Sequence, residues 1–183
     1  NTLAAIRKGK DLGFKGVEFD VMLAAASVPV LIHDETLERT TSGRGAVAQM
    51  PSAALAALDA GSWFGSVFSG EPVPRYAEAV RLCLDLGVWA NVEIKPVQGY
   101  ERDTGRIVAA LSAELWRSAL IAPLLSSFSI AALEAAVAAA PGLPRGLLVD
   151  EIRQGWLDGL AQLNCVSLHC DFKRLTIDQA RAV

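Results

Sequence analysis

The segment GVEFDVM at residues 16–22 decides the fold, because it combines a strand-like apolar run with two alternating acidic residues. Successive side chains of a strand point to opposite faces, so Glu18 and Asp20 share one face and the apolar residues share the other. The segment VWANVEIK at residues 88–95 repeats this pattern, with Glu93 and Lys95 on one face. The apolar faces are suited to packing against helices on the outside of the sheet. The charged faces are then expected to point toward the interior that the sheet encloses.

Further segments of the chain alternate between strand and helix patterns. We expect strands at 16–22, 28–33, 88–95, 120–128, 145–149 and 165–169, and helices at 2–12, 75–86, 101–115, 154–163 and 175–183, with another helix that Ser129 caps and Pro141–Gly142 ends. This alternation predicts an α/β fold with a parallel sheet covered on both faces.

The number of strands favours a closed barrel over an open sheet. The leading helix needs a strand before it and the trailing helix needs one after it, so the six predicted strands become eight. This predicts a TIM (β/α)8 barrel, with residues 1–183 as a single domain that lacks its first and last strands. The alternative is an open doubly wound sheet, which usually carries a glycine-rich phosphate turn after its first strand. This chain shows no such turn, but the expected first strand precedes Asn1, so the alternative stays open.

An irregular stretch at residues 34–74 interrupts the alternation and is rich in Gly, Ser, Thr and Pro. A loop of this length inside a compact domain is usually functional, so we predict a small insertion after the strand at 28–33. Trp63 and Phe64 within it either pack in the insertion or form an apolar wall over a substrate, and packing is slightly favoured.

Composition excludes several functional classes. The net charge is −3 and no Lys/Arg cluster suggests nucleic acid. No apolar run is long enough to span a bilayer. The three cysteines, an odd number without a zinc or redox spacing, are interpreted as core residues in a reducing compartment: Cys83, Cys165 and Cys170. The chain starts without methionine and stops within a helical pattern, so we expect a fragment whose missing part leaves a signal peptide open.

The carboxyl ends of the strands carry the candidate chemistry, as in barrel enzymes. Alternate strands contribute to one interior layer, so Glu18, Asp20 and Glu93 are expected to converge. Buried carboxylates that lie together repel one another, and a divalent Mg²⁺, Ca²⁺ or Mn²⁺ ion relieves that cost. A single E-x-D pattern is more typical of a solvated strand face, but its recurrence as E-x-K favours a metal site.

Other polar residues have competing interpretations. His33 is predicted to lie between the two acidic strands, where an imidazole can move a proton near neutral pH, although a lone histidine is more often structural. Lys95 can neutralise a phosphoryl oxygen or form an internal salt bridge. Ser127 and His169 fit structural and functional roles equally well.

Taken together, these motifs resemble the bacterial glycerophosphodiester phosphodiesterases. The resemblance rests on the Asn1–Thr2–Leu3 start, GVEFDVML, VPVLIHDETLERTTSGRG, LDAGSWF, GEPVPR and NVEIKP, and covers essentially the whole chain in the right order. It implies a cytoplasmic hydrolase that converts small-molecule glycerophosphodiesters to glycerol 3-phosphate and an alcohol. It also implies metal binding by Glu18, Asp20 and Glu93, catalytic roles for His33 and Lys95, and a substrate cap at residues 34–74.

The sequence departs from the family pattern in three respects, the first of which is that the eighth strand is missing. The family's His-Arg-Gly motif, which supplies a second histidine and an arginine, is expected before Asn1. The hairpin turn Ala25–Ser27 replaces an Asp-Gly-like turn. The alternatives that remain are a barrel phospholipase acting on membrane lipid and a non-catalytic relative that binds phosphate esters. Loss of a metal carboxylate would mark the latter, and all three are present.

Overall fold

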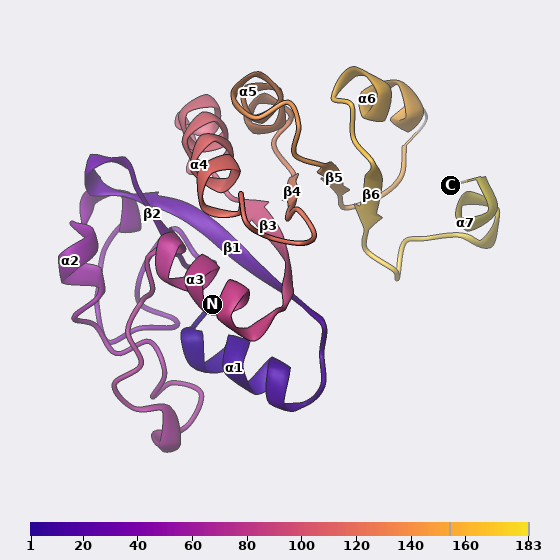
Figure 1. Cartoon of the computed structure of the whole chain (residues 1–183). Helices are drawn as coiled ribbons and strands as arrows, with labels where there is room; N and C mark the ends of the chain where they lie inside the picture. The colour runs from indigo at the N-terminus through magenta and orange to yellow at the C-terminus, as the bar shows by residue number, and fades with distance from the viewer. Residues whose placement is uncertain (154, 183) are drawn as a thin grey trace.

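The computed structural model describes residues 1–153 and 155–182 (Figure 1). In chain order the elements are α1 (Leu3–Asp11), β1 (Gly16–Ala24), η1 (Ala25–Ser27), β2 (Val28–Leu31), η2 (Val47–Gln49), α2 (Ser52–Leu55), η3 (Ser66–Phe68), α3 (Tyr76–Leu86), β3 (Trp89–Ile94), α4 (Glu101–Leu115), β4 (Leu124–Ser127), α5 (Ile130–Ala139), β5 (Arg145–Val149), α6 (Trp156–Gln162), β6 (Ser167–Cys170) and α7 (Ile177–Ala182).

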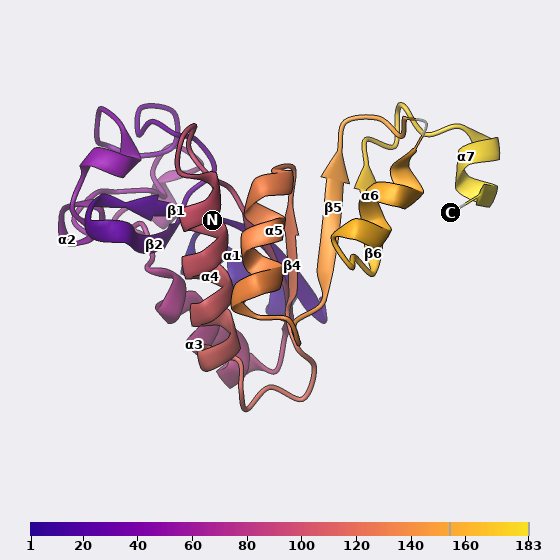
Figure 2. The same cartoon turned by 90° about the horizontal axis from the view of Figure 1, so that it is seen from above.

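The strands form one sheet in the order β2-β1-β3-β4-β5-β6. Each neighbouring pair from β1 to β6 is parallel, whereas β1 and β2 are antiparallel. Seen from above, the sheet runs from the region of residues 25–74 at one side to β6 at the other, and α7 lies beyond β6 (Figure 2). The parallel strands therefore place their carboxyl ends along a common edge.

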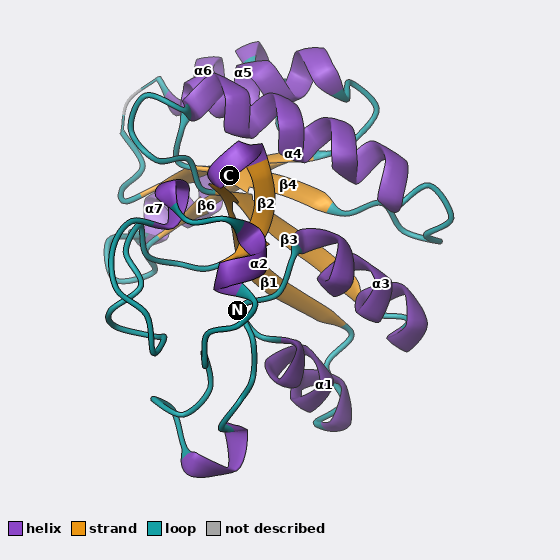
Figure 3. Cartoon of the chain, turned by 90° about the vertical axis from the view of Figure 1, so that its left-hand side faces the viewer, coloured by secondary structure: helices purple, strands orange, loops and turns teal. Residues whose placement is uncertain are grey.

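A hydrophobic core joins the sheet to the helices outside it. Phe19 and Val21 of β1 are almost completely buried there, with Val92 and Ile94 of β3. Figure 3 shows α1, α3, α4, α5 and α6 in an arc outside the strands. The prediction that the apolar faces of β1 and β3 contact helices is confirmed, so their charged residues face the other side.

Local signals in the sequence set the helix boundaries. The hydroxyl of Ser129 accepts a hydrogen bond from the Ala132 N–H at 3.2 Å, which confirms the predicted cap of α5. Thr2 caps α1 in the same way through the Ala5 N–H. Gly87 ends α3 in the left-handed region, with a φ of 60°.

A second hydrophobic core joins the segment at residues 34–74 to the β1–β2 hairpin. Its buried residues are Met22, Ala24, Val30, Ile32, Leu37, Val47, Leu55, Ala60 and Val73. Four of these belong to or adjoin the β1–β2 hairpin and the others to residues 34–74. The segment is thus anchored on the hairpin.

The position of β2 corrects part of the sequence prediction. The sequence prediction includes residues 28–33 among the barrel strands and places His33 between the two acidic strands. β2 instead turns back on β1 through Ala26 and Ser27, both at positive φ, and lies at the edge of the sheet. A turn this short can join only antiparallel strands, because parallel strands need a long crossover. β1 and β3 are consequently direct neighbours rather than alternate strands.

Some boundaries also differ from the prediction. The strand expected at 120–128 begins at Leu124, and Leu120 and Ile121 are exposed. Pro123 explains the late start, since it cannot donate a hydrogen bond to a neighbouring strand. Two residues of the predicted last helices, Gln154 and Val183, lie outside the described residues. Within the described part of the chain, no helix combines the length and apolar character required to cross a bilayer.

Candidate active site

Three carboxylates converge on one face of the paired strands β1 and β3, near the carboxyl end of β3. The register pairs Asp20 with Glu93 and places Glu18 one step earlier on the same face of β1. One oxygen from each of Glu18, Asp20 and Glu93 lies within 4.8 Å of the other two. The structure thus brings together the three residues that the sequence singled out, although through adjacent strands.

The donor set of this acidic cluster, Glu18, Asp20 and Glu93, fits a hard divalent cation. All three side chains offer oxygen, which Mg²⁺, Ca²⁺ and Mn²⁺ prefer. Asn91, opposite Glu18 in the register, adds a buried Oδ1 atom without a hydrogen-bond partner among the described residues. The face therefore carries a further acceptor oxygen beside the carboxylates.

Electrostatic strain in the cluster appears in the pKa values of the two glutamates. Desolvation raises the pKa of Glu18 to about 7, and repulsion by Asp20 and Glu93 adds to the effect. Burial, and then repulsion by Asp20, also raises the pKa of Glu93, whereas Lys95 and His33 lower it. A positive charge bound at this point would relieve the repulsion.

Lys95 lies against the acidic cluster. Its Nζ atom donates to Asp20 Oδ1 at 3.1 Å and lies 3.8 Å from Glu93 Oε1. The structure therefore contains the internal salt bridge that the sequence offered as one interpretation. The ammonium group therefore lies directly beside two of the three carboxylates.

His33 follows β2 and belongs to a hydrogen-bonded row on the surface. Its Nδ1 atom lies 2.7 Å from Asp34 Oδ1, and Asp34 accepts two further bonds from Arg39. The hydrogen bond from Arg39, and then that from His33, lowers the pKa of Asp34. An ionised carboxylate only accepts hydrogen bonds, so Nδ1 carries a proton and Nε2 is left for exchange. The motif HDETLER contains both Asp34 and Arg39, but no strand or helix periodicity marks them as partners of His33.

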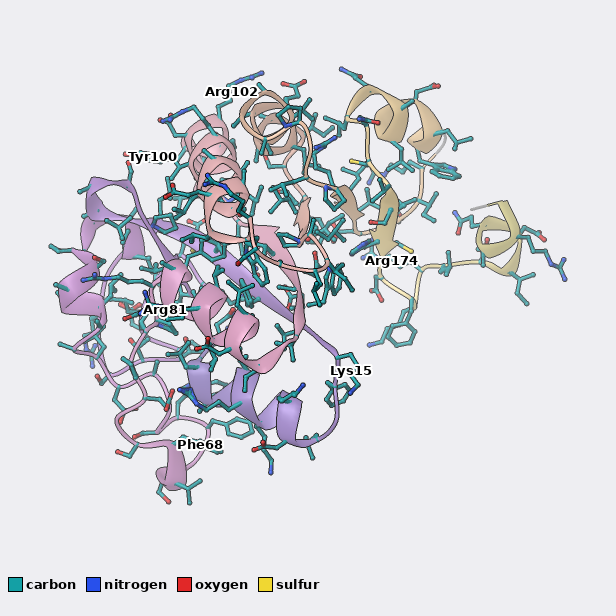
Figure 4. All side chains as sticks on the ribbon, in the orientation of Figure 1. Lys15, Phe68, Arg81, Tyr100, Arg102 and Arg174 are labelled. Carbon is teal, nitrogen blue, oxygen red and sulfur yellow. The ribbon has the colours of Figure 1, made fainter. Side chains whose placement is uncertain are left out.

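A cavity of about 400 Å³ lies beside His33. Residues 31–33, the start of α1 and the segment at 34–74 surround it, and its lining includes Arg39, Trp63, Phe64 and Phe68. Figure 4 labels Phe68 on the loop that lies beside α1. Trp63 and Phe64 touch edge to face, but both keep more than half of their surface exposed. They line the cavity, which fits an apolar wall better than the favoured packing role.

The two remaining candidates do not join the acidic cluster. Ser127 is buried and donates to the Ile94 carbonyl at 2.6 Å, which is a structural contact between β3 and β4. His169 Nε2 lies 3.0 Å from Ser167 Oγ on β6, and desolvation lowers the pKa of His169. Among the described residues, His169 is not part of the group around Asp20.

A family model for glycerophosphoryl diester phosphodiesterases matches residues 1–182. The chain belongs to this family. A glycerophosphodiester phosphodiesterase from Caldanaerobacter subterraneus subsp. tengcongensis is 36% identical over 149 residues, which is 81% of this chain and 60% of that relative. The chain thus spans less than two thirds of that relative's length.

Solved structures of the glycerophosphodiester phosphodiesterase family share the fold. An Oleispira antarctica phosphodiesterase in complex with the product sn-glycerol-3-phosphate has a TM-score of 0.91 and 36% identity, covering 100% of this chain and 73% of its own. A glycerophosphodiester phosphodiesterase from Agrobacterium tumefaciens has a TM-score of 0.77 and 29% identity, and the match covers 93% of this chain and 69% of that structure's chain. The predicted (β/α)8 barrel fold is confirmed.

The raised pKa of Glu18 predicts an unusual pH dependence of stability in the cation-free protein. The pKa of Glu18 is 4.5 in the unfolded chain and about 7 in the folded state. Between these two pH values the folded state therefore holds the Glu18 proton more tightly than the unfolded chain. The free energy of unfolding should therefore fall as the pH rises through this window. Chemical denaturation of chelator-treated protein across the window measures the slope, and Glu18→Gln should flatten it.

Glu101→Gln provides the matched control for this measurement. The pKa of Glu101 is lowered by hydrogen bonds from the N–H groups of Glu101 and Gly99. The contribution of Glu101 to the free energy of unfolding is therefore present above its unfolded pKa and is lost as the pH falls. Glu101→Gln should not flatten the slope. If the Glu18→Gln and wild-type profiles run parallel, the inferred strain at Glu18 is wrong.

Proposed function

We propose that the whole protein is a cation-dependent phosphodiesterase that hydrolyses glycerophosphodiesters to glycerol 3-phosphate and an alcohol. Family membership and the names of the relatives support this activity. The observation that carries the proposal is the convergence of Glu18, Asp20 and Glu93 beside Lys95. Carboxylates this close are costly without a balancing charge, and Lys95 balances only part of theirs.

The three carboxylates and Lys95 have different roles in binding the phosphodiester. Glu18, Asp20 and Glu93 would hold a Mg²⁺, Ca²⁺ or Mn²⁺ ion, which when bound supplies positive charge to the phosphoryl oxygens. Lys95 adds a second positive charge to that group from its position on β3.

His33 provides one of the proton transfers that the hydrolysis requires. The bond between phosphorus and the leaving oxygen breaks while an attacking oxygen forms a new bond to phosphorus, so one proton leaves the attacking oxygen and another reaches the alcohol. Asp34 fixes the imidazole through Nδ1, which leaves Nε2 to take or give the proton. Its half-exposed position at the cavity suits this role.

The segment at residues 34–74 supports the substrate on the side of His33. Its aromatic residues Trp63, Phe64 and Phe68 line the cavity and provide an apolar surface. We infer that this insertion into a single barrel domain caps the substrate. The three free cysteines fit a reducing compartment such as the cytoplasm.

Removal of divalent cations tests the proposed function. We expect hydrolysis of glycerophosphocholine by the whole protein to fall to background in excess EDTA, because the three carboxylates cannot bind a phosphate group without a positive charge between them. Dialysis into Mg²⁺, Ca²⁺ or Mn²⁺ should restore the rate of glycerol 3-phosphate release.

EDTA saturated with Ca²⁺ before it is added serves as the control for effects of the chelator itself. Undiminished turnover in excess free chelator would refute the dependence on a cation. Absence of hydrolysis under every cation tested, in folded protein, would refute the activity.

A further inference from the structure

The carboxamide of Asn1 is bound to both the main chain and the side chain of Asp20. Its Nδ2 atom donates to Asp20 Oδ2 at 2.8 Å, and its Oδ1 atom accepts from the Asp20 N–H at 2.8 Å. The Asn1–Thr2–Leu3 segment supported the family resemblance, yet nothing in the proposed function uses it. These two contacts place Asn1 directly beside the acidic cluster.

Asp20 is held from two sides as a result. Asn1 occupies one position on Oδ2 and Lys95 Nζ occupies one on Oδ1, at 3.1 Å. Only 5% of Asp20 is exposed, so few other orientations are open to its carboxylate. Each carboxylate oxygen has two lone pairs, and each therefore keeps one free acceptor position.

The two donors differ in what they do to the carboxylate. Lys95 carries a charge that competes with a cation for Asp20, whereas the amide of Asn1 orients Oδ2 without neutralising it. Glu18 and Glu93 have no comparable contact with a neutral side chain among the described residues. Asp20 is therefore the member of the cluster whose direction is fixed before a cation binds.

We propose that Asn1 is a positioning residue that holds Asp20 ready to bind the divalent cation. The inference rests on the proposed function, since it assumes that Asp20 is a ligand. Loss of the amide frees Oδ2 to turn toward Lys95, where the ion pair competes with cation binding. Groups that orient a metal ligand in this way typically change metal affinity by about 10–100-fold.

The competing explanation is that Asn1 only fastens the start of α1 to β1. Thr2 allows the two explanations to be distinguished, because its hydroxyl caps α1 by accepting from the Ala5 N–H and does not contact Asp20. Thr2→Ala should weaken the same helix end and leave the acidic cluster unchanged.

The experiment measures Mn²⁺ binding to the whole protein by titration calorimetry, together with the melting temperature of the cation-free form. We expect Asn1→Leu, which keeps the branching of the side chain but removes its polar atoms, to weaken Mn²⁺ binding about 10–100-fold. Thr2→Ala should lower the melting temperature and keep the wild-type Mn²⁺ affinity. Glu93→Gln provides the background for binding elsewhere.

Wild-type Mn²⁺ affinity in folded Asn1→Leu would overturn the positioning role and leave the proposed function intact. Equal losses of affinity in Asn1→Leu and Thr2→Ala would also overturn it, since they would trace to the helix end. If the wild type binds neither Mn²⁺ nor, in parallel titrations, Mg²⁺ or Ca²⁺ above background, the cation dependence in the proposed function is refuted. If Asn1→Leu does not fold, Asn1→Ser is measured instead, with the same loss expected because a serine hydroxyl cannot make both contacts.

Discussion

Glu93→Gln is expected to abolish glycerophosphodiester hydrolysis while making the cation-free protein more stable. Glu93 faces Asp20 in the register, and burial followed by repulsion from Asp20 raises its pKa. A neutral amide removes this repulsion, so the melting temperature in chelator should rise. The same change removes a proposed cation ligand. The loss of Mn²⁺ affinity should therefore exceed the roughly 10–100-fold change that follows loss of a residue that only orients a ligand.

Three measurements on one preparation check this prediction: kcat, Mn²⁺ affinity and the melting temperature with and without cation. Glu101→Gln is the matched control, because the same chemical change is made at a partly exposed helix start outside the acidic cluster. It should leave kcat and Mn²⁺ affinity unchanged. A Glu93→Gln variant that retains wild-type kcat would show that Glu93 is not a ligand.

His33→Ala is expected to lower kcat by about 10²–10⁴-fold, the usual contribution of a positioned acid or base. The side chain of His33 is 55% exposed, so its removal leaves no cavity in a core. The free energy of unfolding should therefore change by no more than about 0.5 kcal/mol. Steady-state kinetics and chemical denaturation of the same variant separate a catalytic role from a structural one.

Substrates with different leaving groups then assign the direction of proton transfer at His33. A nitrophenyl ester leaves without needing a proton, so it should restore the rate of His33→Ala if His33 is the acid. If His33 is the base, the defect should persist with both esters, because the attacking oxygen still needs to lose its proton. An unchanged kcat with glycerophosphocholine would exclude His33 from the mechanism.

The acidic cluster was predictable from the sequence because strand periodicity is a local signal. The alternation in residues 16–22 and 88–95 fixes which side chains share a face, and parallel pairing of the two strands then brings Glu18, Asp20 and Glu93 together. The alternation of strands and helices likewise predicted the barrel. Both predictions need only the order of residues along one element and the general rules of sheet packing.

The position of β2 and the partners of the site residues were not predictable in this way. The Ala25–Ser27 turn is too short for a crossover, but its residues lack the Asn-Gly or Asp-Gly signal of a tight hairpin, and strand periodicity alone counts residues 28–33 as a further barrel strand. The bonds between Asn1 and Asp20 link residues 19 apart on different elements, and no periodicity marks them. The cavity exists only once residues 34–74 have folded against α1.

The core that joins residues 34–74 to the β1–β2 hairpin affects how substrate preference can diverge within this architecture. The acidic cluster is built on β1 and β3, whereas the aromatic residues of the cavity are carried by a segment packed on the β1–β2 hairpin. Evolution can exchange or lengthen that segment by repacking only the small core beneath it, and the three carboxylates keep their positions. Relatives that accept different alcohols are thus expected to vary most between residues 34 and 74, and transplanting this segment between them should transfer alcohol preference while cation affinity stays with the recipient.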